Sequence, residues 1–207
     1  MVKQQNIENF INYGYVPFSK SQCIKRILIT WGMSFIVSLI GRDNRDWQIA
    51  FLCISAFISC VYILLMIRYS TKKFARFICD GVFFEYISLS LCIAAYRIIV
   101  IQVGSSWLLF IILVGLMKVC VALCCVMVYS NIVHDKYNEQ ANHRNSILFP
   151  LIGGISGMVA VRLFLHDATQ NTIIMFLALM ILLLSFITSI GSLNFLKALL
   201  VKRIETT

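Results

Sequence analysis

The sequence predicts an all-α protein: a polytopic bundle of six transmembrane helices with both termini in the cytoplasm. Of its 207 residues, 60% are hydrophobic and only 13% are charged, and the mean hydropathy is +0.87. A soluble domain has about 25% charged residues. Long apolar stretches recur along the chain, and Lys and Arg gather at alternate ends of them. This composition excludes a soluble domain, a disordered chain and a secreted disulfide scaffold.

Six apolar stretches are long enough, or nearly so, to cross a hydrocarbon core about 30 Å thick, which takes roughly 20 residues. They lie at about 24–41, 47–69, 77–101, 107–129, 147–165 and 172–196. The first is the weakest, and Lys25 and Arg26 would have to extend toward the headgroups to help it cross. No linker, low-complexity tract or repeat divides residues 1–207, so we predict one domain.

A mostly polar segment, about residues 1–22, precedes the first stretch. It lacks the apolar run and the cleavage pattern of a secretory signal. Ile7, Phe10 and Ile11 would fall on one side of a helix. We therefore expect an amphipathic helix at about residues 4–13 that lies flat on the cytoplasmic membrane surface.

The distribution of cations sets the predicted orientation in the plasma membrane. Four regions that share one side hold most of the Lys and Arg residues: Lys3, Lys20, Lys25 and Arg26; Arg68, Lys72, Lys73 and Arg76; Lys136 and Arg144; Lys197, Lys202 and Arg203. The opposite side has only Arg42 and Arg45, each beside an aspartate. By the positive-inside rule, the four regions and both termini are cytoplasmic.

The formal charge of +9 does not indicate a nucleic-acid partner, because the cations flank apolar runs instead of forming one patch. Most of the eight cysteines lie inside apolar stretches, where a thiol behaves as a small hydrophobe. Cys120 and Cys124 share a helix face, but no His or carboxylate in that segment completes a metal site. We expect no metal and no cofactor.

Lys118 lies at the middle of the fourth stretch, where a lysine costs about 2.5–3.5 kcal/mol on insertion scales. It must be paired, neutral or in contact with a wet cavity. Folding the hairpin at about Gly104 places Lys118 opposite Ser90, with Glu85 about 7–8 Å closer to the cytoplasm. We predict a Glu85–Lys118 pair that marks a polar cavity open to the cytoplasm, or one that only fixes helix packing.

Two further cations lie near the outer ends of their stretches, Arg97 in the third and Arg162 in the fifth. Both guanidinium groups can reach the headgroups. An excess of intramembrane cations also suits an anionic or zwitterionic ligand, so both residues are candidates for the polar cavity.

Small residues mark a candidate packing surface on the last two stretches. Gly153 and Gly157 form a small-xxx-small step, and Ser185 and Ser189 lie near Gly191. Such residues let helix backbones approach closely in a bilayer. We predict close packing of the fifth and sixth stretches, or a homodimer interface.

A cysteine–histidine couple is a candidate for catalysis. By the predicted topology, Cys79, His134 and His143 share the cytoplasmic surface, and basic residues precede Cys79. A basic setting lowers a thiol pKa, and either histidine could serve as the base. A buried, inert thiol is the alternative.

The layout resembles the accessory gene regulator B family, membrane peptidases of Gram-positive quorum sensing. The stretch Ile67–Cys79 falls where that family has its Arg…Gly-Gly-x-His…Cys segment, and Val133–Lys136 falls at its second polar loop. The resemblance implies that Cys79 is a nucleophile that processes a signal peptide. The sequence departs from the motif, because Lys72 stands where the family has its histidine and the double glycine is absent.

Three functions follow from these observations. The first, not an enzyme, is a protein that binds, passes or senses an anionic or zwitterionic solute or lipid, and that is oligomeric if it forms a pore. The second is the cysteine peptidase acting on a membrane-bound peptide. The third is an accessory or scaffold subunit that docks another membrane protein.

Overall fold

The computed structural model describes residues 4–13, 15, 19–40, 45–69, 72–104, 107–137 and 169–206, and every regular element in these ranges is helical. The elements are α1 (Gln4–Asn12), α2 (Lys20–Leu39), α3 (Arg45–Tyr69), α4 (Lys73–Val103), α5 (Trp107–Val133), α7 (Gln170–Ser189), the 3-10 turn η2 (Ile190–Leu193) and α8 (Asn194–Thr206). The predicted all-α class is confirmed for this part of the chain.

Four of the described helical segments are long and apolar enough to cross a membrane. They are Gln48–Leu65 in α3, Lys73–Ile101 in α4, Trp107–Val133 in α5, and Gln170–Ile204, which runs through α7, η2 and α8. These segments coincide with the predicted stretches at 47–69, 77–101, 107–129 and 172–196. By the length and composition of its helices, the chain is a multi-span helical membrane protein.

The other two predicted spans have different outcomes. The stretch at 24–41 does form a helix, α2, but α2 is not one of the four candidate spans. The stretch at 147–165 lies outside the described residues. Six spans, and the side of the membrane on which the termini lie, therefore stay predictions.

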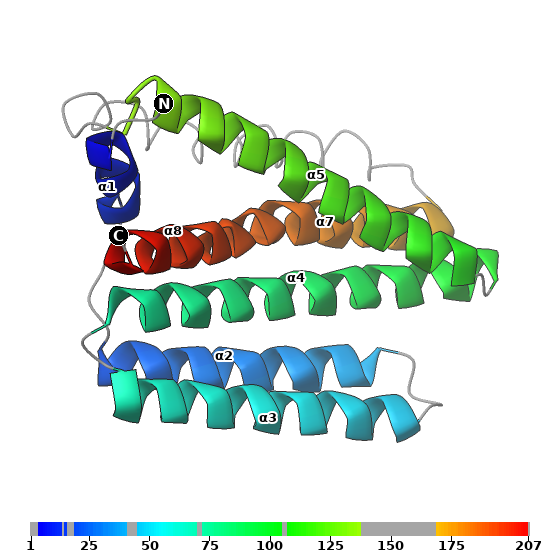
Figure 1. The fold of residues 1–207 in the computed structure, drawn as a ribbon. Helices are drawn as coiled ribbons and strands as arrows, with labels where there is room; N and C mark the ends of the chain where they lie inside the picture. Colours follow the sequence, from blue (N-terminus) through cyan, green and yellow to red (C-terminus); the bar gives the residue numbers. More distant parts are fainter. Residues whose placement is uncertain are drawn as a thin grey trace.

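The central element of the bundle is α4 (Figure 1). The pair α2 and α3 packs along one side of it, while α7, η2 and α8 pack along another, and α5 crosses obliquely to contact α4 and α7. The end of α3, the start of α4, the end of α5, α1 and α8 all lie at one end of the bundle. The cation-rich regions within the described residues therefore share an end, as the charge pattern predicts.

The α4 helix lies close to the rod formed by α7, η2 and α8. At two places, a glycine on one side of this interface lies opposite a phenylalanine on the other side, which permits the close approach. A Cβ atom at Gly81 of α4 would stand 2.9 Å from the ring of Phe195, and one at Gly191 of η2 would stand well under 3.0 Å from Phe84. Real Cβ atoms do not approach other atoms so closely. Because glycine has no Cβ atom, the two phenylalanine side chains can pack directly against the opposing backbone. Small residues allow this close helix packing in membrane proteins.

The N-terminal helix differs from the prediction. We expected the apolar side of α1 to face lipid, but Phe10 and Ile11 are 3% and 5% exposed. Ile11 packs in a cluster with Phe77 of α4 and with Ala198 and Val201 of α8. The apolar side of α1 was predicted correctly, but other helices of the protein cover it. An amphipathic pattern suits a membrane surface and a protein surface equally, so the sequence could not separate them.

Polar side chains of α1 bind the end of α5. Asn6 is 8% exposed, and its Nδ2 donates to the carbonyl oxygens of Ile132 at 3.0 Å and Val133 at 3.4 Å. Asn9 donates to Asp135 at 3.1 Å. The last carbonyls of a helix have no partner within it, so Asn6 caps α5 from outside.

The Asn6→Ala variant should loosen α1 without unfolding the bundle. It removes the bonds from Asn6 to the carbonyls of Ile132 and Val133, and each such hydrogen bond contributes about 1 kcal/mol. We expect faster amide hydrogen exchange in α1 and in the last turn of α5, measured by mass spectrometry. Gln5→Ala, at an exposed neighbouring position, is the matched control. Equal exchange rates in the two variants would show that the Asn6 bonds do not hold α1.

Candidate functional site

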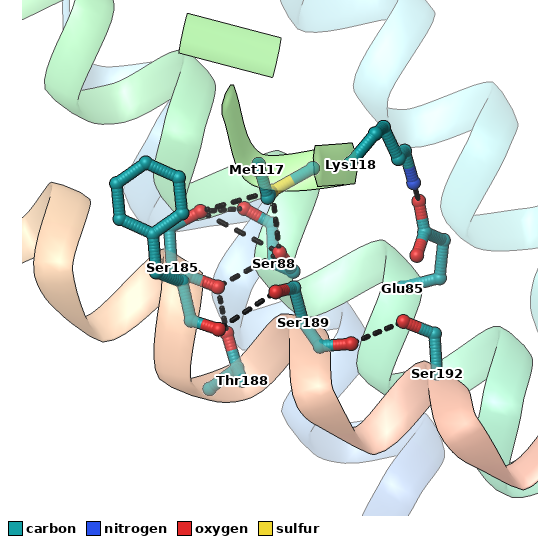
Figure 2. A network of polar contacts seen from close by, with 9 residues as sticks. Glu85, Ser88, Met117, Lys118, Ser185, Thr188, Ser189 and Ser192 are labelled. Atoms are coloured by element: carbon teal, nitrogen blue, oxygen red, sulfur yellow. Dashed lines mark hydrogen bonds and ion pairs between the residues drawn. The ribbon is translucent and has the colours of Figure 1, made fainter. Parts of the chain in front are cut away.

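An ion pair joins two of the candidate spans. Nζ of Lys118 on α5 pairs with Oε1 of Glu85 on α4, and Figure 2 shows the two side chains reaching toward each other. The turn between the helices is responsible. Gly104 ends α4 with a φ of 94°, which glycine adopts without strain, and its N–H bonds to the carbonyl of Val100 at 2.9 Å. The chain then folds back, and α5 passes over α4.

Both charges lie well inside their helices. At a rise of 1.5 Å per residue, Glu85 is about 18 Å from the start of α4 and Lys118 about 17 Å from the start of α5. The Glu85 side chain is 23% exposed and that of Lys118 is 48% exposed. The pair therefore lies near the middle of both helices and is not enclosed by the described helices.

A cluster of hydroxyl groups lies next to the pair and joins α4, α5 and α7. Ser88 and Ser185 donate their hydroxyls to each other's backbone carbonyls at 2.9 and 2.8 Å. Both hydroxyls also contact Sδ of Met117, the residue before Lys118, at 2.9 and 3.5 Å. All three side chains are fully buried. Because Met117 is held here, Lys118 is positioned at the edge of the cluster (Figure 2).

The 3-10 turn η2 contacts both α4 and α5. It interrupts the rod formed by α7, η2 and α8. Side chains bond to backbone carbonyls at this turn. The hydroxyl of Ser192 bonds to the carbonyl of Ser189, and Nδ2 of Asn194 donates to the carbonyl of Gly191 at 2.8 Å. A 3-10 stretch inside a helix often marks a functional hinge. Glu85, Lys118 and η2 thus come from three elements that meet at one level.

Sequence reasoning missed a second hydroxyl cluster, which holds α2 in the bundle. Ser34 of α2 bonds to Ser55 of α3 and to the hydroxyl of Tyr86 on α4, and Ser55 also contacts Tyr86 at 3.1 Å. Ser34 and Ser55 are fully buried. The available signal was the four-residue spacing of Ser55 and Ser59, which puts both on one face of α3.

Sequence reasoning also missed an ion pair between α2 and α4. We expected Arg26 to extend toward the headgroups, but it pairs with Asp80 and its guanidinium lies 5.5 Å from the centre of the Phe83 ring. Arg76, one turn before Asp80, contacts the same carboxylate at 3.4 Å. Lys25, the neighbour of Arg26, is exposed, and its extension toward the headgroups stays a prediction. Nothing in a single sequence indicates that Asp80 faces α2.

The candidate nucleophile lies in the core. Cys79 is 1% exposed and packs with residues of α2 and α3, including Cys23 and Tyr62. His134 follows α5, is exposed, and its Nδ1 lies 2.8 Å from the carbonyl of Ser130. Because Cys79 faces α2 and α3 while α5 crosses a different side of α4, the structure does not bring these two residues together. His143 lies outside the described residues, so a couple with it stays a prediction.

The other candidate residues are dispersed. Arg97 is half-buried in α4 and lies about 18 Å along the helix from Glu85, so it is not part of the ion pair. Arg162, Gly153 and Gly157 lie outside the described residues. Ser185 packs against α4, as described above, and Ser189 is buried and bonds within its own helix to the carbonyl of Phe186 at 2.6 Å. The predicted packing of these serines on the fifth stretch stays a prediction.

Comparison with models of protein families, with curated proteins and with solved structures finds no match for this chain. The resemblance to the accessory gene regulator B family therefore stays a prediction.

Proposed function

We propose that the chain is a six-span protein of the plasma membrane, with both termini cytoplasmic, that binds and passes or senses a small anionic or zwitterionic solute or lipid headgroup. The binding site is the Glu85–Lys118 pair. The observation that carries the proposal is the half-exposed side chain of Lys118 at mid-depth, with its ammonium paired to Glu85.

The exposure of Lys118 separates a binding site from a packing contact. A pair that only joins two helices is most stable when other side chains enclose it and complete its hydrogen bonds. Among the described residues, the Lys118 ammonium donates to Glu85 Oε1, and an ammonium carries three N–H donors, so two of them are left for a ligand. A charge exposed to hydrocarbon is costly, so the exposed side of Lys118 suits a polar cavity better than lipid.

The packing of α2 supports the six-span topology. Its polar residues lower its hydropathy, but Thr30 and Ser34 are fully buried against neighbouring helices. Hydroxyl groups that bond across helices are compatible with a membrane interior. The shared end of the cation-rich regions supports the cytoplasmic placement of both termini.

Binding by purified protein in detergent tests the proposal. Sodium acetate, sodium phosphate and glycine serve as probes, with methylammonium chloride as the cationic control, and isothermal titration calorimetry measures affinity. We expect at least one of the three probes to bind, and Lys118→Ala to weaken that binding by about tenfold or more, as expected when a charge-assisted contact is lost. Lys25→Ala removes an exposed lysine of α2 and should bind as the wild type does. Binding that is absent, or equal in the two variants, would contradict the proposal.

A further inference from the structure

The net charge of the site distinguishes between the two ligand classes. Glu85 and Lys118 carry one charge of each sign and contact each other. If an anion bound to Lys118 and displaced Glu85, the site would hold one excess negative charge. At mid-depth in a bilayer an uncompensated charge is strongly disfavoured. A ligand that carries both charges leaves the sum at zero.

We infer that the ligand of this site is a small zwitterion, whose anionic group pairs with Lys118 while its ammonium pairs with Glu85. The inference rests on the proposed function and narrows its ligand class. One protein ion pair is exchanged for two protein–ligand pairs, so neither charge of the site loses its partner. A cation alone is disfavoured by the same reasoning, because it would leave Lys118 uncompensated.

The arrangement of the helices allows the exchange. Glu85 and Lys118 lie on different helices and pair through their side chains. Separating their charged groups therefore breaks no backbone hydrogen bond. The Lys118 side chain has a flexible stem and is 48% exposed, and it can swing while Met117 stays anchored to Ser88 and Ser185. The adjacent turn η2 contacts both helices and supplies a backbone irregularity that can adjust.

Two sources can provide this chemistry: a free amino-acid-like solute, or the phosphate and ammonium of an ethanolamine lipid headgroup. Glycine represents the first source and glycerophosphoethanolamine represents the second. Acetate and methylammonium carry the two charges separately. Titration calorimetry of the purified protein in detergent compares all four probes.

For the wild type, we expect glycine or glycerophosphoethanolamine to bind about tenfold or more tightly than acetate and methylammonium, because each single charge leaves one protein group unpaired. Binding of glycine indicates that the ligand is a free solute. Binding of glycerophosphoethanolamine without binding of glycine indicates a lipid headgroup. If acetate binds as tightly as either zwitterion, the inference is wrong and the proposed function stands. If none of the four probes binds, the inference is wrong, and the proposed function is wrong as well unless sodium phosphate binds in the test described above.

Variants provide a second measurement that a purely structural role would not affect. Glu85→Gln leaves a site with one positive charge, so its preference should invert toward acetate. Lys118→Gln should invert it toward methylammonium. The two variants leave opposite charges, so one folded variant is enough for the comparison, and an unchanged preference for the zwitterion in either one would overturn the inference.

Discussion

Replacing Gly191 by alanine is expected to destabilise the bundle by about 3 kcal/mol, the upper range for overpacking of a filled interior. The added Cβ would overlap Cβ and Cγ of Phe84, the atoms nearest to the α4 backbone. Those atoms cannot swing away as the end of a long side chain can. The rod formed by α7, η2 and α8 would have to move off α4, which would disturb the bonds between Ser88 and Ser185. Unfolding by sodium dodecyl sulfate, followed by circular dichroism, measures the change.

Two other helical glycines are matched controls. A Cβ at Gly32 of α2 or at Gly115 of α5 would have nothing within 4 Å. Alanine at either position should be neutral or should stabilise by up to about 1 kcal/mol through helix propensity. Combining Gly191→Ala with Phe84→Ala should recover part of the loss, because the overlapping ring is removed. If Gly191→Ala behaves like Gly32→Ala, the close approach of α4 and η2 is wrong.

The long helices and the ion pair could be predicted because both depend on local sequence. An apolar run of sufficient length specifies a membrane helix almost without regard to its surroundings. The contact between Glu85 and Lys118 followed from a short connection and from the helical rise alone. A hairpin has one simple register, and Gly104 marked its turn.

The partner of each helix face could not be predicted, because α4, α5 and α7 are apolar on most sides and no stripe distinguishes the face that meets protein from the face that meets lipid. The bonds between Ser88 and Ser185 join residues 97 positions apart. The glycine–phenylalanine contacts also depend on which rotation of two apolar helices places them opposite each other. In a soluble bundle, hydrophobic periodicity would provide this information.

Cys79 shows the same limit at a candidate site. The basic residues before it favoured an activated thiol only if it faced water. The structure buries it beside Cys23 and Tyr62, with Asp80 and Arg26 paired next to it. Rotation about the axis of α4, which a single sequence does not reveal, decides between a reactive surface and an apolar core.

Breaking the ion pair from one side should destabilise the bundle by about 2–3 kcal/mol. Glu85→Gln leaves Lys118 without its counter-charge, and an unpaired buried charge costs about 3–5 kcal/mol. We expect a smaller loss because the Lys118 side chain is 48% exposed. Lys118→Met should cost a similar amount by leaving Glu85 alone. Unfolding by sodium dodecyl sulfate again provides the measurement.

The double variant distinguishes a true pair from two independent charges. With Glu85→Gln and Lys118→Met combined, no net charge remains, and stability should return to within about 1 kcal/mol of the wild type, since replacing a whole buried pair is often nearly neutral. Lys25→Met, on the exposed side of α2, should change stability by no more than about 0.5 kcal/mol. Losses that simply add in the double variant would show that the two side chains do not interact. A double variant that is stable but binds no zwitterion would place the contribution of the pair in ligand binding and not in folding.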